Sequence, residues 1–183
     1  MKTINTYINE KLRLTTKRQY TCQPKNKLSL QITILNRIKE DGPNCDLNDI
    51  DTSKIKDMSN LFDAGGIKMF KKFNGDVSQW DVSNVKDMKR MFYGCEKFNC
   101  DLSKWNVSKV ENMRWMFCDC EGFNCDISQW DVSNVDGIYF MFWKCKQFNQ
   151  NLDSWNVSKV ENMHHAFEHC PTCPTWYDRK RWE

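Results

Sequence analysis

The chain has 183 residues, of which 40% are hydrophobic and 28% are charged, proportions that are typical of a folded globular protein. Its eight Trp and eleven Phe exclude a disordered chain, because so many large aromatic side chains must be buried. The formal net charge of +3 is too small to indicate a nucleic-acid partner by itself, and no stretch reaches the roughly 18 consecutive apolar residues that a membrane span requires. We therefore expect no membrane contact.

Ten cysteines are many for an intracellular protein, and their even number would suit disulfide bonds. The first residues read MKTINTYINEKLRL and contain neither the apolar segment nor the small-residue cleavage site of a secretory signal. We therefore expect a cytoplasmic protein whose cysteines are reduced thiols.

The first predicted element is a basic helical cap over residues 1–43, which contain nine Lys and Arg against three Asp and Glu. Leu28, Ile32, Leu35 and Ile38 have the three- and four-residue spacing of one helical face, and a Gly-Pro pair after them supplies a stop. We expect this helix to cover one end of the region that follows.

Residues 44–170 consist of a repeat of 25 residues. We call the equivalent positions of successive repeats a column. The Phe column contains Phe73, Phe98, Phe123 and Phe148, and the Trp column contains Trp80, Trp105, Trp130 and Trp155. Coils are expected to start near 44, 73, 98, 123 and 148, and the first is degenerate and carries a five-residue insertion. A fixed period of this length is typical of a solenoid, in which stacked repeats supply the core.

Each repeat contains two kinds of pattern. The portion Phe-Asn-x-Asp-Ile-Ser-x-Trp-x-Val alternates apolar and polar residues, which predicts a strand. The portion Val-x-x-Met-x-x-Met-Phe has apolar residues three and four apart, which predicts one or two helical turns. We therefore expect an α/β fold, a right-handed LRR-like solenoid of about five strand–short-helix coils with an N-terminal helical cap. Residues 171–183 are expected to be a C-terminal capping tail.

The repeat motif resembles a known family. Over roughly residues 44–170 the sequence follows F-N-x-D-[IVL]-S-x-W-[DN]-V-S-x-V-x-x-M-x-x-M-F, which is similar to the BspA-like leucine-rich repeats, the DUF285 domain. The resemblance implies an LRR-like solenoid with a binding role, and many relatives lie on cell surfaces or occur in mycoplasma, gut-bacterial and phage genomes. We expect this chain to differ from the surface members in lacking an export signal and an anchor.

Columns that stay constant are expected to form the core. In one repeat these are Phe98, Trp105, Val107, Val110, Met113 and Phe117. The alternative for the Trp column is binding of carbohydrate or nucleobases. One Cys column contains Cys95, Cys120, Cys145 and Cys170, and a second contains Cys45, Cys100 and Cys125. We expect buried thiols in both, with oxidation to disulfides between adjacent coils as the alternative.

Positions that differ between repeats are where a solenoid binds its partner. Two such sets of positions follow the start of each expected helix and the Met-Phe pair, and they combine aromatic and arginine side chains, which are enriched at interface hot spots. The predicted partner-binding residues are Arg90, Tyr93, Arg114, Trp115, Tyr139, Phe140 and Trp143. The alternative is that several of them pack against neighbouring helices or the C-terminal tail.

The segment 164–173 contains all three histidines and a C-x-x-C motif. A tetrahedral zinc site could be drawn from His165, His169, Cys170 and Cys173. A single C-x-x-C is weak support for such a site, and Cys170 already belongs to a Cys column. The sequence also contains no Gly-rich phosphate loop, nucleophile elbow or H-E-x-x-H motif. We therefore expect no metal, no cofactor and no enzymatic activity.

The leading hypothesis is a non-enzymatic intracellular module that binds another protein. A phage or mobile-element product that sequesters or inhibits a host protein would have this size. The second hypothesis is a nucleic-acid-binding protein, since aromatic side chains beside Lys and Arg hold single strands. Its basic residues would be Lys11, Arg13, Lys17, Arg18, Lys25 and Lys27. Two further hypotheses are a surface adhesin and a self-associating structural component of a larger assembly.

Overall fold

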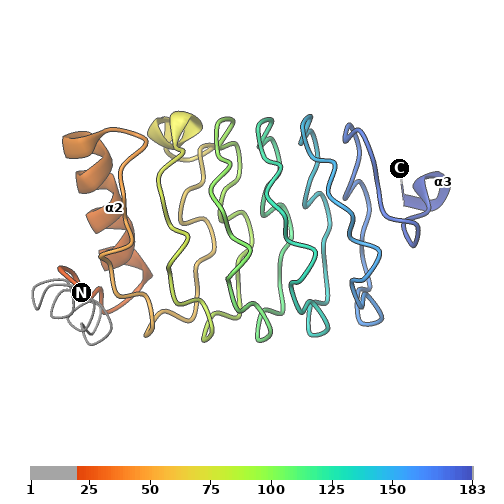
Figure 1. The fold of residues 1–183 in the computed structure, drawn as a ribbon, viewed down its shortest axis with the longest axis horizontal. Coiled ribbons are helices and arrows are strands. Elements are labelled where there is room, and N and C mark those ends of the chain that lie inside the picture. Colours follow the sequence, from red (N-terminus) through yellow and green to blue (C-terminus); the bar gives the residue numbers. More distant parts are fainter. Residues whose placement is uncertain (1–19, 183) are drawn as a thin grey trace, which may run out of the picture.

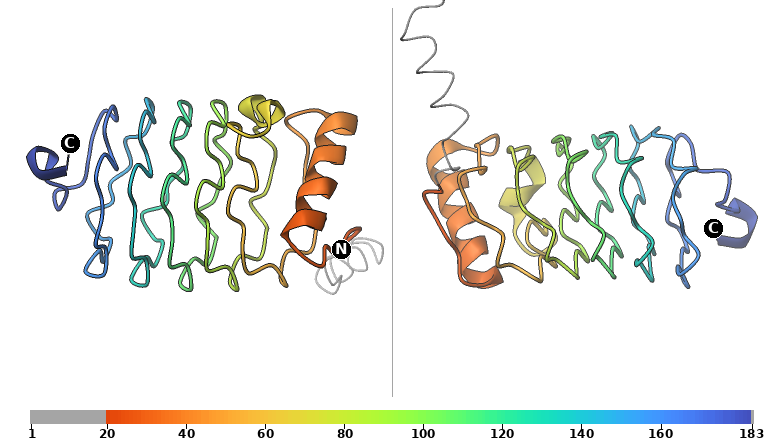
Figure 2. Two further views of the ribbon diagram at one scale, coloured as in Figure 1. Left: turned by 180° about the vertical axis from the view of Figure 1, so that it is seen from behind. Right: turned by 60° about the horizontal axis from the view of Figure 1, so that its bottom comes forward.

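The computed structural model describes residues 20–182. It contains the helix α2 (Lys27–Asp41), the 3-10 helix η1 (Lys68–Lys72) and the short helix α3 (Arg179–Trp182). Between α2 and α3 the chain winds into a row of irregular coils that lie side by side, with α2 at one end and α3 at the other (Figure 1). Figure 2 shows the same row from behind and from an inclined direction.

The predicted fold class is wrong. Within residues 20–182 there is no named strand, and no helix besides α2, η1 and α3. Neighbouring coils meet instead at isolated parallel bridges, such as Asp87 with Asn112 and Asn112 with Gly137. The chain is therefore not an α/β, right-handed LRR-like solenoid of about five strand–short-helix coils.

The portion predicted as a short helix is a run of turns, because two columns within it have positive φ. One column contains Arg90, Trp115, Phe140 and His165, and the other contains Gly94, Asp119, Lys144 and His169. Successive N–H groups also bond differently: Phe92 N–H donates to Met116 O in the next coil (2.9 Å), whereas Met91 N–H donates to Met88 O in its own turn (3.1 Å). A three-residue spacing of apolar side chains fits such turns as well as it fits a helix.

The portion predicted as a strand also consists of turns. Asp101 Oδ1 accepts a hydrogen bond from Ser103 N–H (2.9 Å), and Trp105 N–H donates to Leu102 O (3.0 Å). Side chains of Asp and Asn make such local bonds readily, which competes with pairing of extended strands. The buried side chains of this portion are Phe98, Leu102, Trp105 and Val107, so the turns direct side chains into the core at intervals of four, three and two residues.

The constant columns form the core, as predicted. Phe98, Phe117 and Phe123 are fully buried, and the rings of Phe117 and Phe123 stack with centroids 4.0 Å apart. In the Trp column, Trp105 and Trp130 stack at 6.5 Å, and Trp105 Nε1 donates to Val77 O of the preceding coil (3.1 Å). Each coil thus supplies both the rings and the hydrogen-bond acceptors that its neighbour requires.

Thiols complete the contacts between coils. All ten cysteines are free, and Cys120 is fully buried, with its thiol donating to Phe92 O of the preceding coil (2.9 Å). Cys145 repeats this bond to Phe117 O (3.0 Å). Burial raises the pKa of both thiols well above the ordinary value, so they remain protonated donors.

Helix α2 lies against the first coil and begins at a capping box in which Asn26 and Ser29 bond reciprocally. The face that it buries contains Leu30, Ile34 and Ile38, whereas Leu28 and Ile32 are exposed. The spacing of Leu28 and Ile32 with Ile38 therefore predicted the wrong buried face, because α2 has apolar residues on more than one side. No helix within the described range 20–182 has the length and apolar character needed to cross a membrane.

Candidate partner-binding surface

The seven predicted partner-binding residues are all half-buried. They lie in the turns that follow the Val-x-x-Met portion of three successive coils. We call the set Arg90, Tyr93, Arg114, Trp115, Tyr139, Phe140 and Trp143 the aromatic–arginine strip. Most of its members contact at least one other member.

Local hydrogen bonds place the strip in each coil. Asn112 Oδ1 accepts from Arg114 N–H (3.2 Å), which starts the turn, and Trp115 then takes φ 55°. Trp115 N–H donates to Tyr139 O in the next coil (2.9 Å), and Phe140 N–H repeats this bond one coil further along. These bonds hold equivalent side chains of neighbouring coils next to each other.

Four aromatic rings of the strip form one cluster. Trp115 stacks on Phe140 with centroids 6.2 Å apart and meets Tyr139 edge-on at 4.9 Å. Phe140 also contacts Tyr139 at 4.5 Å and Trp143 at 5.7 Å, both edge-on. Edge-on and offset contacts are the favoured arrangements of aromatic pairs, so the rings support one another while remaining half-exposed.

Arg90 is held from two sides. Its Nε lies 2.9 Å from Asp63 Oδ2, and its guanidinium carbon lies 3.9 Å from the centre of the Tyr93 ring. Burial by itself would lower the pKa of Arg90, but the hydrogen bond and charge of Asp63 outweigh it and raise that pKa above the ordinary value. The strip therefore holds the charged Arg90 guanidinium in a fixed position, paired with Asp63.

Arg114 depends on a glycine. Its Nη1 pairs with Asp136 Oδ1 at 3.0 Å, and a Cβ atom added to Gly137 would lie 2.5 Å from the guanidinium carbon. The equivalent positions of the neighbouring coils contain Asn112 and Asn162. Gly137 thus leaves the space that the Arg114 guanidinium occupies.

The strip continues beyond the predicted residues. His165 lies on Phe140 with ring centroids 4.6 Å apart, and Lys144 Nζ lies 3.7 Å from the centre of the Trp143 ring. Glu168 connects the two histidines of this end, because its Oε2 is 2.7 Å from His165 Nδ1 and its Oε1 is 3.3 Å from His169 Nε2. The sequence contained the signal for this extension, since His165 belongs to the column of Trp115 and Phe140.

The four residues of the hypothetical zinc set point to different partners. Both histidines turn to Glu168, the Cys170 thiol donates to Phe142 O (3.0 Å), and Arg179 Nε donates to Cys173 Sγ (3.3 Å). In the part of the chain that the structure describes, no three His, Cys, Asp or Glu side chains are grouped as metal ligands.

The predicted nucleic-acid residues are described only in part. Lys11, Arg13, Lys17 and Arg18 lie outside the described residues. Lys25 is exposed, and Lys27 pairs with Asp57 (2.7 Å) and donates to Ser59 Oγ (2.8 Å). The structure therefore shows one exposed and one paired lysine of this set.

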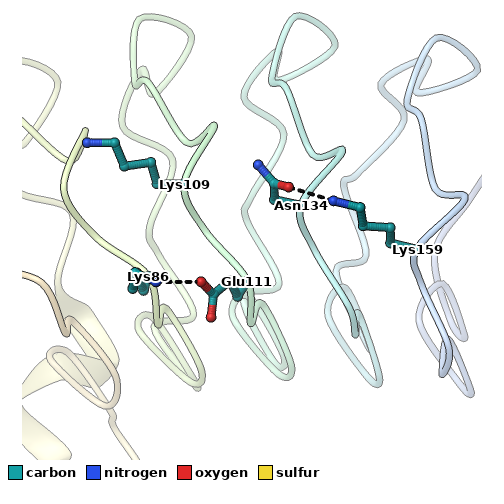
Figure 3. A pocket seen from close by; sticks show the side chains of 5 residues that line it. All are labelled: Lys86, Lys109, Glu111, Asn134 and Lys159. Carbon is teal, nitrogen blue, oxygen red and sulfur yellow. Dashed lines mark hydrogen bonds and ion pairs between the residues drawn. The ribbon is translucent and has the colours of Figure 1, made fainter.

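A hollow of about 420 Å³ lies along several coils and is lined by Lys86, Lys109, Glu111, Asn134 and Lys159 (Figure 3). Lys86 Nζ lies 2.7 Å from Glu111 Oε1, and Lys159 Nζ donates to Asn134 Oδ1 at 2.7 Å. These bonds join adjacent coils. The hollow is therefore lined by polar contacts that stack one coil on the next.

Comparison with protein families matches residues 64–178 to the family described as "Mycoplasma protein of unknown function, DUF285". Comparison with curated proteins gives no match, and neither does comparison with solved structures. The matched range contains the whole aromatic–arginine strip.

Proposed function

The chain belongs to the DUF285 family, whose description gives no activity, and we propose from its surface that it is a non-enzymatic protein-binding module. The aromatic–arginine strip is the proposed binding surface. Its chemistry is that of interface hot spots, which are rich in Trp, Tyr and Arg.

The observation that carries this proposal is the presence of large rings at left-handed backbone positions. Trp115 has φ 55° and Phe140 has φ 54°. This conformation favours Gly and Asn and costs other residues about 1 kcal/mol or more. Gly94 shows that glycine fits the second column of this kind. The turns themselves therefore do not require aromatic rings, and the half-exposed rings suit contact with a partner.

The order within the strip supports the same function. Arg90 is fixed by Asp63 and Arg114 by Asp136, while the rings of Trp115 and Phe140 restrain each other. A surface whose side chains are already ordered loses less conformational entropy on binding. The strip is therefore suited to a folded protein partner.

We place this binding in the cytoplasm. All ten cysteines are free thiols, and several donate hydrogen bonds to carbonyl groups inside the stack, as Cys120 does. A reducing compartment keeps such thiols intact.

The test is affinity capture of the tagged full chain from a lysate of its source organism under reducing conditions, with captured protein and nucleic acid analysed together. The captured partner is then purified and titrated against the wild type and against a Trp115→Asn/Phe140→Asn variant. We expect the variant to bind about tenfold or more weakly, because hot-spot residues dominate interface energy.

A Lys109→Ala/Lys159→Ala variant is the matched control, since it removes two exposed side chains from the hollow of Figure 3 and leaves the strip unchanged. Equal affinity of the strip variant and the wild type would overturn the proposal. Capture of nucleic acid alone, with loss in rising salt, would favour the nucleic-acid hypothesis instead.

A further inference from the structure

A second surface with binding character lies at the opposite end of the row from α3. Figures 1 and 2 both show η1 beside the C-terminal end of α2. A hollow of about 460 Å³ lies between these elements and is lined by Ile38, Pro43, Lys68, Met69, Lys71 and Lys72. This volume lies within the range of ligand-binding hollows.

The wall of this hollow is the insertion of the first coil. Phe62 and Phe73 are separated by 11 positions, whereas the equivalent Phe92 and Phe98 are separated by 6, so the first coil has five additional residues. Within them Phe70 anchors η1 in the core, being fully buried and edge-on to Phe62 at 5.4 Å. The later coils stack without these residues, and insertions in repeat arrays often build the binding face.

The hollow combines an apolar floor with a basic rim. Ile38 and Pro43 belong to the floor, and Met69 is one of the few large apolar side chains that the described residues expose, at 37%. Methionine adapts its shape to different apolar groups, which suits an exchangeable occupant.

The charges on the rim are only partly neutralised. Lys71 Nζ pairs with Glu96 Oε1 at 3.0 Å. Lys68 and Lys72 form no ion pair with the described residues. Lys97, which follows Lys72 in its column, is exposed as well. An occupant that complements this surface has carboxylates beside a bulky apolar group.

We propose that the hollow between α2 and η1 binds an acidic peptide segment of a partner protein, with one large apolar side chain of the peptide placed against Met69 and Ile38. The carboxylates of the peptide face Lys68 and Lys72. A concave apolar floor accommodates a single inserted side chain better than it accommodates a flat lipid surface, so the peptide is favoured over an anionic membrane.

The test uses the full chain and fluorescein-labelled heptapeptides of sequence Glu-Asp-Glu-X-Asp-Glu-Asp, in which X is Leu, Met, Phe, Trp or Ala. Fluorescence anisotropy measures binding at low and at physiological salt. We expect at least one of the four peptides with a large apolar residue at X to bind about tenfold more tightly than the peptide with Ala, because that side chain fills the hollow. A matched peptide with Gln and Asn in place of Glu and Asp should bind more weakly by a similar factor.

A Lys68→Gln/Met69→Ser/Lys72→Gln variant should lose this binding about tenfold, while its thermal unfolding remains that of the wild type because all three side chains are exposed. The matched control is Lys104→Gln/Lys109→Gln, which removes two exposed lysines from another part of the row. The Trp115→Asn/Phe140→Asn variant should bind the peptides like the wild type, so failure of this proposal and failure of the strip as a binding surface are distinguishable.

Three results would overturn the proposal. One is the absence of binding for all four apolar peptides, and another is equal binding of the Ala peptide. The third is association with phosphatidylserine vesicles that depends on Met69 while the peptides do not bind.

Discussion

The buried Trp column and the half-exposed strip are two rows of aromatic side chains with different surroundings, and Trp105 and Trp115 represent them within one coil. Trp105 is 4% exposed, stacks on Trp130 and donates its Nε1 hydrogen to Val77 O. Trp115 is half-buried, has positive φ and contacts rings of the neighbouring coil at the surface. The same residue type therefore serves packing at one position and is available to a partner at the other.

Constancy of a residue from coil to coil and an unusual backbone conformation indicate different roles. Trp105 belongs to a column in which the four complete repeats all have Trp, because each coil must present the same shape to its neighbour. The column of Trp115 contains Arg90, Phe140 and His165, which share only the left-handed conformation. Variation at a position where the backbone disfavours large side chains indicates a role outside packing.

The largest expected effect separates the two tryptophans by stability. Trp105→Ala should lower the free energy of unfolding by about 3–5 kcal/mol, because it leaves a cavity and removes the hydrogen bond from Trp105 Nε1 to Val77 O. Trp115→Ala should lower it by less than about 1 kcal/mol. Urea unfolding followed by circular dichroism measures both. Equal losses for the two variants would contradict the distinction between packing and surface rows.

The second prediction concerns the buried thiols that accompany the Trp column. Burial raises the pKa of Cys120 well above its ordinary value, so the folded protein holds this proton more tightly than the unfolded chain. The resulting stability is complete below the unfolded thiol pKa of about 8.5 and declines above it, by up to about 1.4 kcal/mol per pH unit for each such cysteine.

Between pH 9 and pH 10 the free energy of unfolding should therefore fall less in Cys120→Ala than in the wild type, by up to about 1.4 kcal/mol. Urea unfolding at each pH measures this difference. Val135→Ala is the control, because it removes buried volume without an ionisable group and should lower stability equally at both pH values. Parallel pH curves for Cys120→Ala and the wild type would show that the buried thiol does not couple folding to pH.

The sequence predicted the buried columns correctly, whereas the expected fold class was wrong, and the binding role of the strip stays a prediction. Apolar columns such as those of Phe98 and Trp105 identified buried positions, because a repeated unit must repeat its packing. The expected helices were wrong, since apolar side chains three apart, such as Met88 and Met91, suit stacked turns equally well. Positive φ could not be predicted, because the columns that adopt it contain Gly94 but otherwise residues such as Arg90 and Phe140, which do not indicate that conformation. His165 was not predicted to belong to the strip, although it lies in the column of Arg90 and Phe140.

The third prediction changes the strip without changing its aromatic rings. Gly137→Asn introduces the residue found in the equivalent position of both neighbouring coils, but its Cβ would meet the Arg114 guanidinium. The guanidinium ends a flexible side chain and can move away, so we expect stability to fall by no more than about 1 kcal/mol. Affinity for the captured partner should fall more strongly than stability, as titration calorimetry would show. Unchanged affinity would mean that the position of Arg114 is irrelevant to binding.

The smallest expected effect on stability comes from replacing the ring at a left-handed position by the side chain that the backbone favours. Phe140→Asn loses ring contacts worth about 0.5–1.5 kcal/mol and relieves backbone strain of about 1 kcal/mol, so the two effects nearly cancel. Phe140→Val loses the same contacts without that relief, since a β-branched residue is poorly accommodated at positive φ.

The two variants should therefore differ by about 1–2 kcal/mol in their free energy of unfolding, measured with urea. Both should lose partner binding, because both lack the ring, so stability reports the backbone at residue 140 and affinity reports its side chain. If Phe140→Asn were instead as unstable as Phe140→Val, the ring would be part of the packing of the coils and the distinction between the two rows would fail at this position.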